Sequence, residues 1–140
     1  MKIPVMLSIC GRQAYMDQEP DIIELVTEGT MEFRDGGWDI SYEESDLTGL
    51  SGVTTNFRVE KGKVTLSRNG RLFSEMVFQE GISHSSLYQM EFGALLITVC
   101  ATRIFAQLGE GFGMLDLVYN IDIEQSATGT VDYHLENTPK

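Results

Sequence analysis

Residues 53–78 read VTTNFRVEKGKVTLSRNGRLFSEMVF, and this stretch decides the fold. Apolar and polar residues alternate along its three runs, as they do when one face of a β-strand is buried and the other is wet. The dipeptides Lys61-Gly62 and Asn69-Gly70 separate the runs, and a glycine there supplies the positive φ that a two-residue hairpin turn needs. The stretch predicts three antiparallel strands joined by tight turns.

The same alternation continues toward both ends of the chain. Asp35-Gly36-Gly37 predicts another hairpin turn, and Gly109 to Gly113 predicts a further one. The segment from Leu95 to Leu108 is apolar on both faces, and its β-branched residues favour a strand over a helix. Strands are expected over residues 5–9, 23–33, 38–42, 53–59, 64–68, 72–78, 87–92, 95–108, 115–123 and 131–135.

This pattern predicts an all-β protein, built as a small closed antiparallel meander barrel of about eight to ten strands. Closing the sheet removes the exposed strand edges that would otherwise favour aggregation. A chain of 140 residues lies within the usual range of one domain, so we expect residues 1–140 to form a single β-barrel domain.

The charge balance narrows the set of partners. Lysine and arginine number 10 against 21 aspartate and glutamate residues, a net charge of −11. Such a surface repels nucleic-acid phosphates and anionic lipid alike, so we expect neither nucleic acid nor a membrane as partner. No window reaches the roughly 18 apolar residues of a membrane helix, and we expect a cytoplasmic protein. Cys10 and Cys100 stand among apolar residues, which predicts buried, reduced thiols.

Familiar catalytic and metal-binding motifs do not stand out in the sequence. His84 and His134 are the only histidines, and there is no Cys-x-x-Cys, so we predict no metal and no cofactor. The glycines from Gly109 to Gly113 lack the Gly-Lys-Ser/Thr ending of a phosphate loop. The run Ser83 to Ser86 places hydroxyls beside an imidazole without a third member, and we predict no catalytic residue.

Strand parity nevertheless directs charged residues inward. Glu44 falls on the same face as Tyr42, and Arg68 falls on the same face as Leu66. An unpaired buried charge is costly, so the two side chains should meet each other, a ligand or water. Arg103 is a candidate third member, although a strand that is apolar on both faces leaves its direction open.

Two interpretations of these charges follow. Glu44 and Arg68 form an internal salt bridge that closes one barrel end, or Arg68 anchors the anionic group of a small ligand. The same aromatic and apolar residues that would surround a ligand would equally well fill a solid core. The candidate ligand-binding residues are Tyr42, Glu44, Arg68, Met76, Phe78, Tyr88, Arg103 and Tyr119.

Short motifs along nearly the whole chain resemble a known family. They are Glu28-Gly29, Tyr42-Glu43-Glu44-Ser45, Thr48-Gly49, Thr54-Thr55, Arg68 with Gly70, Met76 with Phe78, Tyr88 leading to Phe92-Gly93, and Gly113 leading to Leu117 and Tyr119. In this order and spacing they resemble the uncharacterised bacterial YwiB-like family, whose fold is a lipocalin-like (calycin) barrel. Met90 departs from the family pattern, which has a threonine there. The resemblance implies a barrel and brings no activity, substrate or catalytic residue.

Three function classes remain open from the sequence. The first is a binding module that holds a small hydrophobic or amphipathic anionic ligand in the barrel. The second is a protein–protein adaptor or homodimer with a filled barrel and an acidic surface. The third is an enzyme that uses Glu44 as a general base. A cavity of about 300 Å³ or more would favour the ligand, whereas an interior closed by side chains would favour the adaptor.

Overall fold

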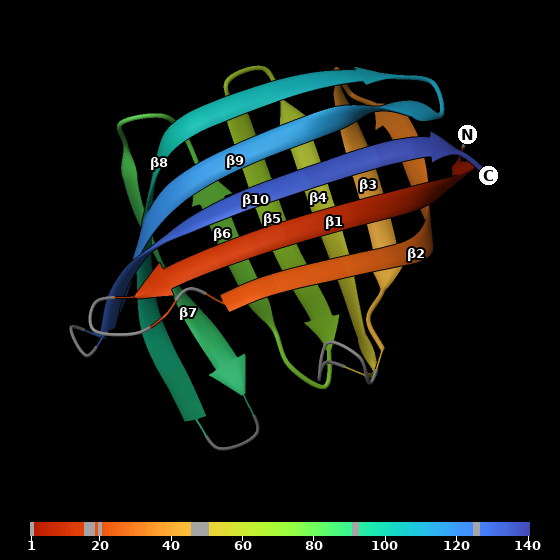
Figure 1. Ribbon diagram of the computed structural model, residues 1–140. Coiled ribbons are helices and arrows are strands. Elements are labelled where there is room, and N and C mark those ends of the chain that lie inside the picture. Colours follow the sequence, from red (N-terminus) through yellow and green to blue (C-terminus); the bar gives the residue numbers. More distant parts are fainter. Residues whose placement is uncertain (1, 16–18, 20, 46–50, 91–92, 125–126) are drawn as a thin grey trace.

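The computed structural model describes residues 2–15, 19, 21–45, 51–90, 93–124 and 127–140, and every regular element in them is a β-strand (Figure 1). The strands are β1 (Ile3–Tyr15), β2 (Asp21–Arg34), β3 (Gly37–Glu43), β4 (Val53–Glu60), β5 (Lys63–Gly70), β6 (Ser74–Phe78), β7 (Ser83–Met90), β8 (Gly93–Gly109), β9 (Phe112–Ile123) and β10 (Ala127–Pro139). Within the described residues, no helix is long and apolar enough to cross a membrane.

All ten strands belong to one antiparallel sheet, in the order β6-β5-β4-β3-β2-β1-β10-β9-β8-β7. Strands that follow one another in sequence are therefore neighbours, and β1 pairs with β10 along nearly its whole length. The sheet curls so that β6 and β7 meet, where the backbones of Phe73 and Gln89 exchange hydrogen bonds of 3.0 and 2.8 Å. The predicted all-β meander barrel is confirmed, and it is nearly closed.

The turns agree with the sequence at most positions. Gly36, Gly62 and Gly111 have φ values of +79°, +76° and +79° in three hairpins, as expected of glycines in tight turns. Asn69-Gly70 is different, because Arg68 pairs with Ser74 and the connection is longer than two residues. A Cβ at Gly70 would lie 2.1 Å from the carbonyl oxygen of Gly52, so this glycine allows a close backbone approach instead of forming a two-residue turn.

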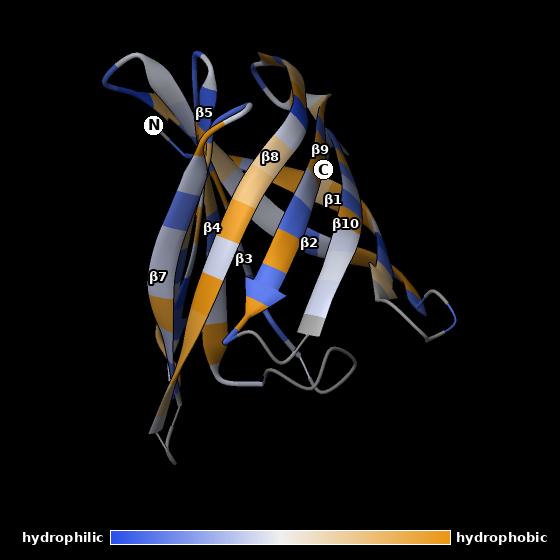
Figure 2. Cartoon of the chain, turned by 90° about the vertical axis from the view of Figure 1, so that its left-hand side faces the viewer, coloured by the Kyte–Doolittle hydropathy of each residue, from blue (hydrophilic) through white to orange (hydrophobic). Residues whose placement is uncertain are grey.

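Side chains fill one end of the barrel and leave the other end hollow. Fully buried apolar residues come from the early part of β1, the late part of β2 and the strand segments opposite them. Each such side chain contributes about 1.5–3 kcal/mol to stability by leaving water. The largest are Phe57, Phe78, Leu7, Met31, Ile40, Leu115, Leu117 and Leu135. Hydrophobic and hydrophilic bands alternate along β9 (Figure 2), and its buried residues Leu115 and Leu117 belong to this core.

A β-bulge in β8 reverses which residues point inward. Ala101 pairs with Tyr119 and Arg103 pairs with Val118, so Thr102 is the extra residue. Beyond the bulge Ile104 faces the core and Arg103 lies on the exposed outer face. Arg103, whose direction the sequence left open, is therefore not a third member of the inward charged group, because a bulge shifts the side-chain alternation by one residue.

The two cysteines also differ from expectation. Cys10 is exposed and Cys100 is half-buried, and neither forms a disulfide. Cys10 lies opposite Glu24 and His134, on the outer face of β1. Strand parity decides this placement: Cys10 shares the face of Ser8 and Arg12, while the apolar neighbours in sequence point the other way.

β2 leaves its neighbour β3 at Gly29. Pairing between these strands runs from Arg34 to Thr30 of β2 and ends there, while β1 stays paired with β2 as far as Asp21. A Cβ at Gly29 would lie 2.5 Å from the carbonyl oxygen of Ser41 and 2.6 Å from Cδ1 of Leu7. Figure 1 shows the first half of β2 running apart from β3. Along this half, β1 is the only paired strand among the described residues.

Candidate ligand-binding cavity

The hollow end of the barrel contains a cavity of about 440 Å³. Every strand except β4 contributes to its walls, through residues near the strand end that lies at this side of the barrel. Most lining side chains are aliphatic or aromatic. They are Ile9, Gly11, Gln13, Ile23, Leu25, Tyr42, Glu44, Leu66, Arg68, Met76, Tyr88, Leu95, Ile97, Tyr119, Ile121, Ile123, Val131 and Tyr133.

Glu44 supplies the carboxylate of the cavity. It follows directly on β3, where its backbone N–H donates to the carbonyl oxygen of Val53 at 2.8 Å. Its side chain is 2% exposed and accepts a 2.5 Å hydrogen bond from the hydroxyl of Thr55, which is fully buried. The carboxylate is therefore held in place from the neighbouring strand β4.

Arg68 supplies the cation. It lies near the end of β5 and pairs across the ladder with Thr55, so the strand register brings it beside Glu44. Its Nε lies 4.0 Å from Oε2 of Glu44, which makes an ion pair longer than a hydrogen bond. That Nε is buried and donates no hydrogen bond within the described part of the chain. The guanidinium thus keeps a buried donor available at the cavity wall.

Two tyrosines extend this polar cluster. Burial, as the main cause, raises the pKa of Tyr42 to about 12, and Tyr133 and Glu44 are the polar side chains beside its hydroxyl. Burial and the neighbouring Tyr42 raise the pKa of Tyr133 well above its usual value. Both phenols therefore stay protonated at neutral pH and can donate or accept hydrogen bonds inside the cavity.

Six of the eight residues singled out from the sequence line the cavity: Tyr42, Glu44, Arg68, Met76, Tyr88 and Tyr119. Phe78 is fully buried in the filled end, where its ring packs against Tyr119 with centroids 4.4 Å apart. Arg103 lies outside the barrel for the reason given above.

Gln13 and Tyr133 are polar lining residues that the sequence reasoning missed. The signal for both was alternation. Gln13 continues the inward parity of Leu7 and Ile9 at the end of β1, and Tyr133 alternates with Val131 and Leu135 on β10. The motif positions Thr48-Gly49 and Phe92 lie outside the described residues.

The chemistry of the cavity is that of a binding site. A cation, a carboxylate and two phenols interrupt an otherwise mostly apolar wall. Both histidines are elsewhere: His84 is hydrogen-bonded to Gln79 at 2.7 Å, and His134 contacts Asp116 and Glu136. Across the described residues no group of three or more histidine, cysteine, aspartate or glutamate side chains could hold a metal ion.

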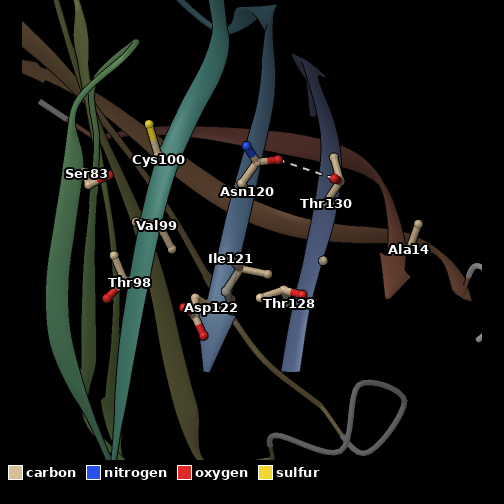
Figure 3. A pocket seen from close by; sticks show the side chains of 11 residues that line it. Ala14, Ser83, Thr98, Val99, Cys100, Asn120, Ile121, Asp122, Thr128 and Thr130 are labelled. Atoms are coloured by element: carbon tan, nitrogen blue, oxygen red, sulfur yellow. Dashed lines mark hydrogen bonds between the residues drawn. The ribbon is translucent and has the colours of Figure 1, made fainter. Parts of the chain in front are cut away.

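A second hollow, of about 420 Å³, lies against the outward-facing side chains of β8, β9 and β10 (Figure 3). Short polar side chains such as Thr98, Asn120 and Thr130 line much of it, and Thr130 donates a 3.3 Å hydrogen bond to Asn120. Cys100 and Ser83 lie at one side of it (Figure 3). Arg68 and the tyrosines have no counterpart among its lining residues, so the interior cavity is the better candidate site.

Comparison with known proteins places this chain in a described family. The family model for a domain of unknown function, DUF1934, matches residues 7–135. This chain belongs to the DUF1934 family. An uncharacterised β-barrel protein, YwiB of Bacillus subtilis (strain 168), is 29% identical over 122 residues, which cover 86% of this chain and 80% of YwiB. The family resemblance inferred from the motifs is thereby confirmed.

A crystal structure of YwiB from Bacillus subtilis matches this DUF1934 chain with a TM-score of 0.82 at 24% sequence identity. The match covers 96% of this chain and 92% of the YwiB chain. A likeness at this identity shows a shared β-barrel fold, and the function has to be argued from the cavity itself.

Proposed function

We propose that this DUF1934 chain is a binding protein that holds a small amphipathic molecule inside its barrel. The ligand has an apolar body and an anionic head such as a carboxylate. One observation carries the inference: a cavity of about 440 Å³ with largely apolar walls has the guanidinium of Arg68 at its surface. No chemical step is assigned to the site, and we infer a non-enzymatic role.

The size and lining of the cavity support a small ligand. Ligand sites usually measure about 300–1,000 Å³ and combine apolar walls with a few well-placed polar groups. The filled-barrel alternative, a protein–protein adaptor or homodimer, needs an interior closed by side chains. The hollow end therefore favours ligand binding over that alternative.

Arg68 is the natural contact for the anionic head. Its buried Nε lacks a hydrogen bond to any described residue, and an anion would satisfy that donor. Glu44 is held by the hydroxyl of Thr55, so its carboxylate keeps another partner when a ligand engages Arg68. Aliphatic residues of the cavity wall in the first half of β2, such as Ile23 and Leu25, would contact the apolar body of the ligand.

Binding can be tested with a fluorescent fatty acid and its displacement by medium-chain carboxylates, alcohols and amines of matched length. We expect saturable binding, with the carboxylates displacing the probe best. Leu25→Trp replaces an isobutyl side chain at the cavity wall with a bulky indole ring, and this variant should lose binding. Arg68→Gln should weaken carboxylate binding about tenfold or more, equivalent to about 1.4 kcal/mol.

Arg103→Gln is the matched control, because it removes the same charge from the outer face. It should leave the affinity unchanged. If the wild type binds none of the three ligand series, the function proposed here is wrong. If Arg68→Gln and Arg103→Gln bind carboxylates equally, the cavity holds apolar molecules without an arginine anchor. Circular dichroism of each variant checks that it is folded.

A further inference from the structure

The first half of β2, from Asp21 to Glu28, has a free edge. Its hydrogen-bonded neighbour is β1, and the ladder with β3 ends at Thr30. Half of the backbone N–H and C=O groups along such a segment point away from β1, toward a position where a further strand would fit. In the described part of the chain no strand occupies that position. An unpaired edge of this kind is a template for strand addition.

Both faces of this edge carry exposed apolar side chains. Ile22 and Val26, on the outer face, are 62% and 68% exposed, and Ile23 on the inner face is 49% exposed. Branched aliphatic residues at these alternating positions are well suited to pack against a neighbouring strand. An added strand would cover these side chains and would complete the wall beside the cavity residues Ile23 and Leu25.

The charges along the edge identify the chemistry of the partner. Asp21, Glu24 and Glu28 stand on this segment, and β2 contains no basic residue before Arg34. Glu28 is already paired with Lys140 at 3.0 Å. Asp21 and Glu24 are exposed, and Arg12 on the adjoining strand is the basic residue opposite this region. A partner strand with basic residues would complement this edge, whereas an acidic one would be repelled.

We propose that the free edge of β2 over Asp21–Glu28 is a docking site for an extended, basic segment of another protein, which adds to the barrel as an antiparallel or parallel strand. Its lysine or arginine side chains lie on the outer face, beside Glu24, and its apolar residues alternate with them on the inner face, beside Ile23 and Leu25. A second copy of this chain is a poorer occupant, because each copy carries a net charge of −11 and would bring Glu24 and Glu28 against the same acids.

A short synthetic peptide in which lysine and valine alternate tests this site directly. Three matched peptides are compared by fluorescence anisotropy: the lysine–valine peptide, a glutamate–valine peptide, and the lysine–valine peptide with every backbone amide nitrogen methylated. We expect binding of the first, at least about tenfold weaker binding of the second, and loss of binding for the third, because N-methylation removes the main-chain donors that strand addition uses. Amide hydrogen exchange should slow within residues 21–28.

Glu24→Lys should weaken binding of the lysine–valine peptide about tenfold. Asp132→Lys is the control, since it makes the same charge change at an exposed position of β10, a strand that is paired on both sides. Equal binding of the N-methylated peptide, or equal weakening by Asp132→Lys, would show attraction to the acidic surface in general and would overturn the proposal. Protection of residues 21–28 that rises with protein concentration alone would assign the edge to a second copy and would also overturn it.

Discussion

Arg68 and Glu44 form an ion pair inside the barrel, with Nε and Oε2 4.0 Å apart. The two side chains differ in surroundings. Glu44 is 2% exposed and has Thr55 as a further partner, whereas Arg68 is 19% exposed and its Nε has no hydrogen bond in the described residues. Glu44 is therefore tightly fixed, and Arg68 is the partner that can turn toward a ligand.

Breaking this pair should destabilise the protein. Arg68→Met leaves the buried carboxylate without its countercharge, and we expect a loss of about 1–3 kcal/mol in the free energy of unfolding. This is less than the ~3–5 kcal/mol of a fully buried pair, because the pair is long and Arg68 is partly solvated. Adding Glu44→Leu should recover much of the loss. Urea denaturation measures both, and a single variant as stable as the wild type would show that the pair contributes nothing.

Tyr42 should make the protein sensitive to alkaline pH. Burial raises its pKa from about 10 in the unfolded chain to about 12 in the folded protein. The contribution of the protonated Tyr42 to the free energy of unfolding is fully present below about pH 10. It is lost as pH rises through about 12, and the loss is on the order of 2 kcal/mol. Unfolding measured between pH 9 and pH 12 should show a smaller decline for Tyr42→Phe. An identical decline in the two proteins would contradict this explanation.

The pKa of His134 should be higher than that of an ordinary histidine. Hydrogen bonds to Asp116 and then Glu136 raise its pKa, and both carboxylates favour the protonated ring. A raised folded pKa means that the stabilisation is present below the unfolded value of about 6.5 and disappears as pH rises through the folded value. NMR titration of the imidazole protons measures the shift. Asp116→Asn should lower the pKa of His134, and no change would rule out the assigned cause.

Substitution by alanine should lower the stability of the protein at Gly29 and leave it nearly unchanged at Gly11. Gly29→Ala places a Cβ against the Ser41 backbone and Leu7, and we expect a loss of about 1–3 kcal/mol as β2 is pushed from β3. At Gly11 the nearest atom to a new Cβ is 3.7 Å away, in the Tyr133 ring, so Gly11→Ala should be close to neutral. Thermal unfolding compares the two. Equal stability of both variants would mean that β2 can shift at Gly29 without cost.

Strand parity accounts for what the sequence could predict about the site. In strands with uninterrupted alternation, such as β5 and β9, parity correctly placed Arg68 and Tyr119 inside the barrel. Parity gave no direction for Arg103, because β8 is apolar on both faces and its local sequence does not reveal the bulge at Thr102. Parity also places Cys10 on the outer face with Ser8 and Arg12, so the prediction of a buried thiol, which rested on its apolar sequence neighbours, was wrong.

The division of the interior into a filled end and a hollow end could not be read from the sequence. Leu7 in the packed core and Ile9 beside the cavity follow the same alternation and are both apolar. What separates them is how far the strands spread and where β2 leaves β3, and these depend on twist and register across the whole sheet.

The pairing of β1 with β10 constrains how this protein is made. Val5 lies opposite Pro139, so the barrel wall joins residues from near the two ends of the sequence. During synthesis on the ribosome, β1 emerges before β10, so its edge stays unoccupied until residues 127–139 have left the exit tunnel. Contacts this distant in sequence slow folding and prolong exposure of the edge. Slow translation of β10 would therefore lengthen the time during which the nascent chain exposes an aggregation-prone strand edge.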